Sequence, residues 1–584
     1  MRIYLLLPFL FCGFFDAALL ASNWQTKIDP EVLAELEAGG RVEVIVALQE
    51  QADLHLAYRI HGKTAKGQYV YQTVRALAER TQQPIRKILA DNGVAYRSFA
   101  VVNALLTEVD LPLARALAER EEVANIQPNP WTVFDRPTLD LTPTGAGRGV
   151  VEWGIQRIHA DAVWDLGFRG EGITVAGQDT GYDWEHPAIK NQYRGWDGTT
   201  ADHNYNWHDA IRAISLLHND SIVSPTNNPC GLGVSVPCDD HSHGTHTMGT
   251  MVGDDGGDNQ IGVAPAANWI GCRNMERGWG SPGSYIECFD WFLAPTNLAG
   301  ENPDPARAPH VINNSWGCPA VEGCNPDNFA LMELAIDALR AAGVVVVVSA
   351  GNDGPACGSI RNPAAIFAGS FSVGASRSDD TIANFSSRGA VTIDSSFRLK
   401  PNVVAPGVGV RSAIRNGGYA TWNGTSMAGP HVAGAVALLL AAAPQLAGEV
   451  DSIEAILQTT ALPLLSNQDC GPFAGLAVPN ATYGYGRIDV LAAVARGQQV
   501  VATEQGSPAE PTLLFPNPTH GQFWVLDQTI TAPTLFTLCD ATGRQVLSVQ
   551  LDNALQQITL GTLPAGIYFY RMGGGDQQGK LVVW

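Results

Sequence analysis

Positive charge is scarce in this chain, and the deficit excludes whole classes of partner. Its 584 residues include 36 lysines and arginines against 57 aspartates and glutamates, which gives a formal net charge of −21. This balance argues against nucleic acid or an anionic membrane as a partner. Charged residues make up 16% and apolar residues 45% of the chain, which is typical of globular proteins. The length predicts about two to four domains.

Long apolar runs are absent beyond the N-terminus. The valine run 344–348 is short and the run Ala435–Ala443 ends at a proline, whereas a membrane-spanning helix needs about 20 residues. Residues 1–21 combine one arginine, an apolar run and small residues near the end. This pattern predicts a secretory signal peptide cleaved after Ala21, and a mature protein without a transmembrane segment.

None of the ten cysteines belongs to a CxxC pair, which argues against zinc binding by these residues. Export instead permits disulfides. Cys230/Cys238 and Cys318/Cys324 are close enough in sequence to form paired loops. Four further cysteines are available for two more bridges, whose pairing the sequence leaves open: Cys272, Cys288, Cys357 and Cys470. Cys539 would then be the odd one, because Cys12 leaves with the signal peptide.

Residues 22–135 have the pattern of a small α/β sandwich. Strand patterns at 41–49, 101–109 and 123–130 alternate with helical patterns at 73–93 and 112–123. The stretch that follows is rich in proline, threonine and glycine. It predicts an exposed linker over 136–151 that contains a processing site.

Residues 152–497 alternate short, continuously apolar strands with helices. This alternation predicts an α/β fold with a buried, doubly wound parallel sheet. In such sheets, functional groups gather at the carboxyl ends of the strands. After a linker at 498–511, residues 512–584 alternate strands with turns, which predicts a small β-sandwich.

Two motifs carry an acid and a base. Asp179 ends the strand pattern "ITVAGQ" and is followed by Thr-Gly, and His243 opens the run "HGTH". Taken alone, either could be a structural residue. The spacing of His241, His243 and His246 also resembles a zinc cluster, but Thr245 stands where di-zinc hydrolases have aspartate.

A third motif, "NGTSMAGPH", contains Ser426 among small residues at the start of an apolar helical stretch. Small neighbours let a ligand approach, and helix N-termini favour developing negative charge. A serine that merely caps the helix is an equal alternative. In "VINNSWG", Ser315–Gly317 follow a strand whose edge could pair with an extended peptide. In "SAGN", Asn352 could direct its amide into a cleft.

Together and in this order, these motifs resemble those of the subtilisin-like serine proteases, peptidase family S8, and most of all its bacillopeptidase F-like members. The similarity covers about Glu152 to Val494. It implies a serine endopeptidase in which Asp179, His243 and Ser426 are catalytic. It also implies an oxyanion hole and a substrate-binding cleft. The oxyanion hole would be Asn352 with the Ser426 amide, and the cleft would be lined by Ser315, Trp316, Gly317, Ala350 and Gly351.

The resemblance implies no cofactor for the chemistry and leaves structural calcium open. Asp254, Asp255 and Asp258 are candidate ligands, although a solvated acidic turn explains them better. About 60 residues separate Asp179 from His243, and this insertion, which contains Cys230 and Cys238, is absent from shorter family members. It is expected to alter the rim of the cleft.

The flanking units have resemblances of their own. "VVNA" and the ending "VANIQPN" are similar to the inhibitor I9-type propeptide, which implies an intramolecular inhibitor and chaperone; an unrelated α/β module is the alternative. "FPNPTHGQFWV", "LPAGIYFYRM" and the final "GKLVVW" resemble the type IX secretion sorting domain of Bacteroidetes. That implies the type IX machinery as a partner, with a substrate-binding β-module as the alternative.

The sequence therefore predicts a secreted serine endopeptidase that is made as a preproprotein and acts on proteins or peptides of varied sequence. It would be extracellular or attached to the outer cell surface. Three alternatives remain: a processing protease of narrow specificity, an inactive subtilase-like surface-binding protein, and a metallohydrolase that uses the histidine cluster.

Overall fold

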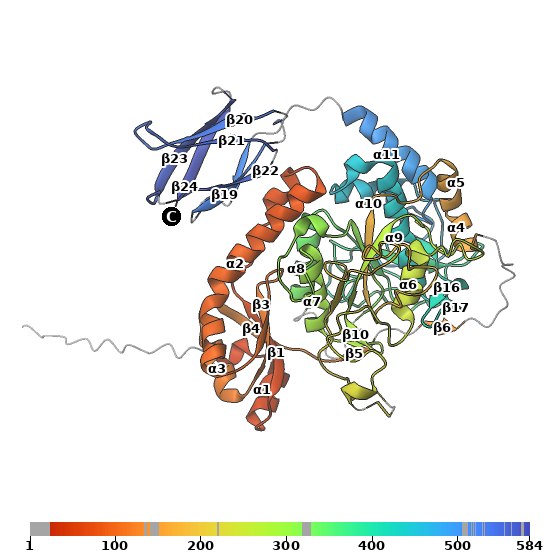
Figure 1. Ribbon diagram of the computed structural model, residues 1–584. Coiled ribbons are helices and arrows are strands. Elements are labelled where there is room, and N and C mark those ends of the chain that lie inside the picture. Colours follow the sequence, from red (N-terminus) through yellow and green to blue (C-terminus); the bar gives the residue numbers. More distant parts are fainter. Residues whose placement is uncertain are drawn as a thin grey trace, which may run out of the picture.

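The computed structural model of the chain (Figure 1) describes residues 24–133, 137–139, 151–504 and 512–583. Short gaps fall at 219–220, 223 and 318–328, and at several positions between 516 and 576. The predicted signal peptide, most of the predicted linker 136–151, and the Cys318/Cys324 pair therefore lie outside the described residues.

The N-terminal unit is an antiparallel four-stranded sheet with helices on one face. Its strands, in the order β2-β3-β1-β4, are β1 (Val42–Leu48), β2 (Tyr96–Phe99), β3 (Ala104–Val109) and β4 (Val123–Pro128), and its helices are α1 (Pro30–Glu37), α2 (Lys63–Asp91) and α3 (Leu111–Ala118). The second face packs on the unit of residues 152–497, called the catalytic unit after its predicted role, because Ile45 and Leu106 share a buried cluster with helix α7 (Pro282–Leu293). The strands predicted at 41–49, 101–109 and 123–130 are present.

Helix α2 differs from its prediction at the N-terminal end. It begins at Lys63 instead of residue 73, and Figure 1 shows it reaching from the N-terminal sheet to helix α8 (Ala330–Ala341). The added segment, "KTAKGQYVYQ", contains a glycine and two tyrosines, which are weak helix formers. Contacts with the catalytic unit hold this part of the helix, and a local pattern does not contain them.

The catalytic unit is built on a seven-stranded sheet in which every pairing is parallel, which confirms the predicted fold. The order is β15-β14-β13-β12-β7-β9-β8, with β7 at Thr174–Asp179, β8 at Trp207–Asp209, β9 at Asn268–Arg273, β12 at Val311–Asn314, β13 at Val345–Ser349, β14 at Phe371–Ser376 and β15 at Val403–Pro406. Continuously apolar strands suit this position, since both faces are covered.

Helices cover both faces of this sheet. Helices α7 (Pro282–Leu293) and α8 (Ala330–Ala341) pack on one face; the other carries α6 (His243–Val252), α9 (Thr425–Ala442), α10 (Val450–Thr459) and α11 (Val490–Glu504). Short helices α4 (Trp153–Arg157) and α5 (Ala160–Asp165) precede β7. Among the described residues, α9 alone is long and apolar enough to cross a membrane, but 89% of its apolar window is buried within the protein, as expected of a core helix.

Two small sheets join the end of the N-terminal unit to the catalytic unit. Strand β5 (Thr132–Val133) pairs with the hairpin β10 (Met275–Glu276) and β11 (Trp279–Gly280), and β6 (Thr138–Leu139) pairs with the hairpin β16 (Val410–Ile414) and β17 (Gly418–Asn423). The expectation of an exposed linker therefore misses strand β6, whose two residues pair with Trp422 and Asn423 while their side chains stay exposed.

The C-terminal unit consists of two antiparallel sheets around one apolar cluster, the predicted β-sandwich. One sheet holds β18 (Leu513–Phe515), β19 (Gln522–Leu526) and β22 (Leu555–Thr559), and the other holds β20 (Thr534–Cys539), β21 (Gln545–Leu551), β23 (Gly566–Met572) and β24 (Gln577–Val583). Helix α11 continues through Glu504, so the first part of the predicted linker 498–511 is helical.

Three disulfides lie within the described residues. Cys230–Cys238 closes the predicted loop, and the open pairing resolves to Cys272–Cys288 and Cys357–Cys470. Cys539 is a free thiol, as expected for the odd cysteine.

Candidate active site

The acidic residue lies at the carboxyl end of β7, a central strand of the sheet. Asp179 is the last residue of β7 and is 1% exposed. Two glycines let this strand end meet the start of α6. A Cβ on Gly181 would lie 1.8 Å from the Cys238 carbonyl oxygen, and one on Gly244 would lie 2.0 Å from the Gly181 oxygen. The motifs "DTG" and "HGT" therefore require glycine for this close contact.

Asp179 and His243 form a hydrogen-bonded pair that is closed to solvent. His243 is the first residue of α6 and is 0% exposed. Its Nδ1 lies 2.7 Å from Asp179 Oδ1 and 2.9 Å from Oδ2. A carboxylate at this nitrogen favours the tautomer with the proton on Nδ1 and would stabilise an imidazolium.

Ser426 is the second residue of α9, the helix that packs against α6. Its hydroxyl donates to the Ser315 carbonyl at 3.3 Å, and the Ser315 hydroxyl donates to the Ser426 carbonyl at 3.2 Å. These contacts join the start of α9 to the residues that follow β12. The amides of a helix N-terminus are directed towards any negative charge that develops there.

Asn352 is held beside the same helix end. Its Oδ1 accepts from the Thr425 amide at 2.9 Å and from the Thr425 hydroxyl at 3.0 Å. The Thr425 hydroxyl in turn accepts from the Gly351 amide at 3.2 Å. Because both bonds use the carbonyl side of the Asn352 amide, the orientation of its NH2 group is fixed, and this group remains a donor for a ligand.

A shallow pocket lies next to Ser426 and is lined without any charged side chain. The nine predicted catalytic, oxyanion and substrate-binding residues divide between this pocket and the Asp179–His243 pair. Those that line the pocket are Ser315, Trp316, Gly317, Ala350, Gly351, Asn352 and Ser426. Strand β12 is an interior strand that is paired on both sides over 311–314, so the edge predicted at Ser315–Gly317 lies beyond its paired residues.

Comparison with known proteins identifies the family of the chain. Residues 170–486 match the model of the subtilase family, Peptidase_S8. The chain belongs to the subtilase family of serine proteases. Residues 513–583 match a second model, described as a secretion system C-terminal sorting domain.

Named relatives of this subtilase include bacillopeptidase F of Bacillus subtilis (strain 168), which is 34% identical over 508 residues. That match covers 81% of this chain but 33% of the relative, so the chain spans about a third of bacillopeptidase F. Subtilisin E of the same organism is 27% identical over 64% of this chain and 79% of its own length. An alkaline protease of Shouchella clausii is 32% identical over 62% of this chain and 78% of its own length.

His246 has structural contacts in this subtilase. Its ring stacks on Trp422 with a centroid distance of 4.6 Å, and its Nε2 lies 3.2 Å from the Ala420 carbonyl. Burial, with a smaller contribution from His243, lowers the pKa of His246 to about 3. No group of three or more potential metal ligands occurs within the described part of the chain. Asp254 and Asp255 instead accept backbone amides of their own turn.

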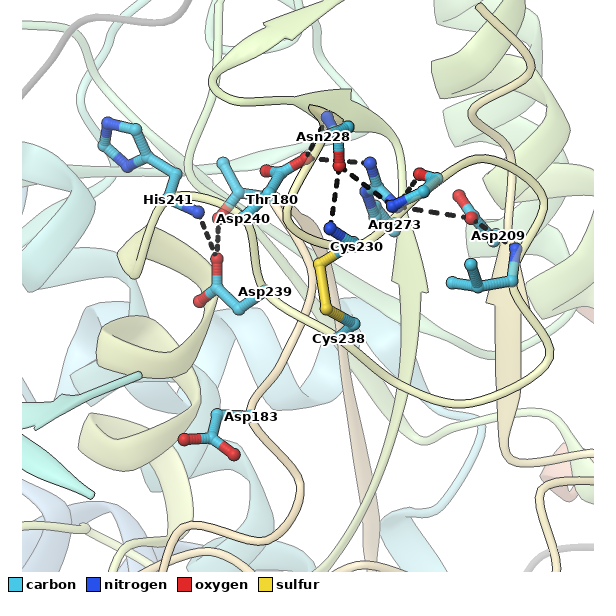
Figure 2. Close-up of a disulfide and its surroundings, with 12 residues drawn as sticks. Thr180, Asp183, Asp209, Asn228, Cys230, Cys238, Asp239, Asp240, His241 and Arg273 are labelled. Atoms are coloured by element: carbon cyan, nitrogen blue, oxygen red, sulfur yellow. Dashed lines mark hydrogen bonds and ion pairs between the residues drawn. A yellow bond between two sulfur atoms is a disulfide. The ribbon is translucent and has the colours of Figure 1, made fainter. Parts of the chain in front are cut away.

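Asp239 is a site residue that the motif analysis missed. Its Oδ1 accepts from the Thr180 hydroxyl at 2.9 Å and the amides of His241 and Ser242 at 2.9 and 2.7 Å (Figure 2). Its Oδ2 accepts from the Thr245 amide at 3.0 Å and hydroxyl at 2.6 Å. One buried carboxylate thus joins the residue after Asp179 to the first turn of α6. The sequence signal that could have identified Asp239 is an acidic residue four positions before His243, the first residue of the helix.

The insertion before α6 is held next to this carboxylate (Figure 2). The Cys230–Cys238 disulfide precedes Asp239 directly, and the buried Arg273 lies 2.7 Å from Asp240. Burial raises the pKa of Asp240 to about 7, and Arg273 opposes that shift. A surface cavity is lined by the disulfide loop together with Asp183 to Glu185 and Asn416. The insertion thus forms a wall beside the start of α6.

Proposed function

We propose that this subtilase is a secreted serine endopeptidase that hydrolyses peptide bonds through Asp179, His243 and Ser426. The buried hydrogen bond between Asp179 and His243 is the observation that carries the proposal. An inactive binding protein would have no need to bury this acid–base pair at the start of a helix that packs against the helix of Ser426.

Each residue has a separate role in the proposed reaction. The Ser426 hydroxyl leaves the Ser315 carbonyl and attacks the substrate carbonyl carbon while His243 takes its proton. The C–N bond then breaks, and His243 returns the proton to the leaving amine. Water attacks the acyl-enzyme with the same base and releases the acid. Asp179 keeps His243 oriented and stabilises the imidazolium in both steps.

The tetrahedral intermediates would be stabilised by donors that are already in place. The Asn352 NH2 group and the Ser426 amide are the proposed oxyanion donors, because Thr425 fixes the asparagine from its other side. The residues after β12 offer main-chain pairing to an extended substrate, which does not depend on side chains. The lining of the pocket beside Ser426 is uncharged, so it offers no ion pair that would select a charged side chain before the scissile bond.

The N-terminal unit is proposed to be an inhibitory propeptide. Thr132 of β5 lies 3.0 Å from the Tyr285 hydroxyl, and the Tyr285 ring stacks on Trp316 in the pocket wall at 3.9 Å between centroids. Further along the chain, β6 pairs with β17, which leads into Ser426. The chain thus contacts the catalytic unit on both sides of the serine, which supports a cleavage between Val133 and Thr138.

A covalent serine reagent tests the catalytic proposal. We expect a fluorophosphonate to label the wild-type protein and the Ser396→Ala control, which loses an exposed serine, but not Ser426→Ala. The Ser426→Ala chain should also stay uncut, whereas the wild type should acquire a new amino terminus at one of residues 134–138. Equal labelling of Ser426→Ala would reject the assignment, and sensitivity to chelators alone would favour a metallohydrolase.

The C-terminal unit is proposed to direct export through a type IX machinery, after which the protease is released or attached to the outer surface. Its match to a sorting domain supports this role. In a host with that machinery, a chain that ends at residue 504 should accumulate inside the cell. A truncated chain that reaches the medium at the wild-type level would reject a sorting role.

A further inference from the structure

The first half of helix α2 contacts the catalytic unit far from the candidate active site. Apart from this contact, the N-terminal unit binds at α7. There the Asp290 carboxylate accepts hydrogen bonds from the Ala100 and Val101 amides at 3.0 and 2.7 Å. Arg97 forms an ion pair with Glu287 of the same helix at 2.5 Å. The start of α2 instead lies against α8 and the short 3-10 helix Pro305–Arg307. This second contact has its own chemistry.

Two buried lysines make the second contact, which we call the far anchor. Lys63 Nζ donates to the Ala308 carbonyl at 2.6 Å, and Lys66 Nζ donates to the Gly448 carbonyl at 2.7 Å. Lys66 also pairs with the Glu449 carboxylate at 3.1 Å. These two lysines are 8% and 5% exposed, respectively. The far anchor consists of both lysines with Ala308, Gly448 and Glu449.

Backbone contacts make the fit close. The Lys63 amide donates to the Ala447 carbonyl at 3.1 Å. A Cβ added to Gly448, whose φ is +96°, would lie 2.6 Å from the Lys63 nitrogen. Apolar side chains continue the contact, because Val70 and Val74 belong to the same buried cluster as Leu339 of α8. The surface therefore matches this helix in shape as well as in charge.

The acceptors at the far anchor match the two lysine side chains. Gly448 touches Gly343, which follows the C-terminal end of α8, and Glu449 is the N-cap residue of α10. Helix C-termini carry partial negative charge and exposed carbonyls, which favour cations. A buried ammonium without acceptors is costly, so only a surface that offers these carbonyls accepts the two lysines. Burial, with a smaller effect of Arg194, lowers the pKa of Lys63 to about 7; the buried His310 also faces it.

The far anchor lies at the opposite end of α9 from the nucleophile. Ser426 opens α9, and residues 447–449 follow its end at Ala442. At about 1.5 Å rise per residue, the helix alone separates its ends by about 24 Å. Ala308 likewise precedes β12, whereas Ser315 follows that strand. A ligand of the far anchor therefore does not compete with substrate for the cleft.

We propose that the catalytic-unit side of the far anchor, formed by Ala308, Gly448 and Glu449, is an exosite for a lysine-bearing helix, and that its resident ligand is the first half of α2. The exosite retains the N-terminal unit after the linker is cut, so release of the inhibitor requires this contact to open as well. This inference rests on the proposed cleavage of the linker but not on catalysis by Ser426.

The test separates retention from activity. A foreign protease site is inserted at residues 140–150 of the full-length Ser426→Ala chain, the linker is cut with that protease, and the two pieces are followed by size-exclusion chromatography. We expect the N-terminal unit to stay bound, and Lys63→Ala with Lys66→Ala to release it at least tenfold faster. The matched control is Lys87→Ala, an exposed lysine of the same helix, which should behave as the unchanged chain.

Retention in the lysine variant equal to that of the control would overturn the proposal. If the lysine variant fails to fold, Glu449→Gln tests the same contact from the catalytic side and should also speed release. Unchanged release in Glu449→Gln would then count against the exosite. Because the chain is inactive throughout, these outcomes do not depend on whether the protein is a protease.

Discussion

Replacing Asp239 by asparagine should damage catalysis while leaving substrate binding largely intact. The carboxylate accepts from Thr180, His241, Ser242 and Thr245. The oxygen of an asparagine side chain can still accept the hydrogen bonds that Oδ1 of Asp239 accepts from Thr180, His241 and Ser242. Its NH2 group then faces the Thr245 amide, which loses its acceptor. A lost bond to a buried charged group costs about 1.5–3 kcal/mol, so we expect unfolding to become easier by about that amount.

The catalytic effect follows from the position of the lost bond. The hydrogen bond between Asp239 and the Thr245 amide holds the first turn of α6, which His243 begins. A catalytic group displaced by about 1 Å can lower the rate about 100-fold. We expect kcat to fall about 10- to 100-fold with KM nearly unchanged, because Asp239 does not line the pocket beside Ser426. Kinetics on a peptide substrate measure this, and urea unfolding in a Ser426→Ala background measures stability without self-digestion.

Asp197→Asn is the matched control for this change. Asp197 also accepts several hydrogen bonds, from Thr199 and Thr200, but it is exposed in a turn. Water can replace the lost partner there, so stability and kcat should both stay close to wild type. If Asp239→Asn loses the expected stability but keeps kcat within twofold, Asp239 does not position His243 and the reasoning is refuted.

Three further predictions concern the oxyanion donor, the far anchor and the largest disulfide loop. Asn352→Ala should lower kcat about 100- to 1,000-fold with little change in KM, a magnitude taken over from the corresponding donor of subtilisin; an unchanged kcat would remove Asn352 from the mechanism. Because Lys63 has a pKa of about 7 when docked and about 10.4 when exposed, docking releases a proton between these values. Retention of the cut N-terminal unit should therefore strengthen up to tenfold per pH unit above about 7, as size-exclusion chromatography over a pH series would measure, and Lys63→Met should abolish that slope. Cys357→Ser with Cys470→Ser opens a loop of 113 residues and should lower the free energy of unfolding by up to about 4–5 kcal/mol in urea titrations; a loss below 1 kcal/mol would contradict this.

Local sequence patterns were sufficient to predict the sheet architecture of the catalytic unit and to propose the candidate catalytic residues. Strands such as Val345–Ser349 are apolar throughout because both faces of a parallel sheet are covered, and that property is written in consecutive residues. Asp179, His243 and Ser426 could be proposed because each lies in a short motif whose glycines are needed for close backbone contacts, as at Gly181 and Gly244.

Other features depend on residues that meet only in the folded chain. Asp239 gains its role from donors on β7 and α6, and the pairing of Cys272 with Cys288 depends on α7 lying against β9. Strand β6 exists because β17 offers it an edge. Long-range contacts of this kind leave no periodic signal in either partner.

The sequence by itself determined the fold class, the order of the motifs and the family, since strand and helix periodicity and motif spacing are local properties. Tertiary structure alone decided how the N-terminal unit is attached. Residues 63–72 include Gly67 and other weak helix formers among stronger ones, and Lys63 and Lys66 would be expected at the surface. The two lysines are buried in the helix because the carbonyls of Ala308 and Gly448, hundreds of residues away in the sequence, accept hydrogen bonds from their ammonium groups.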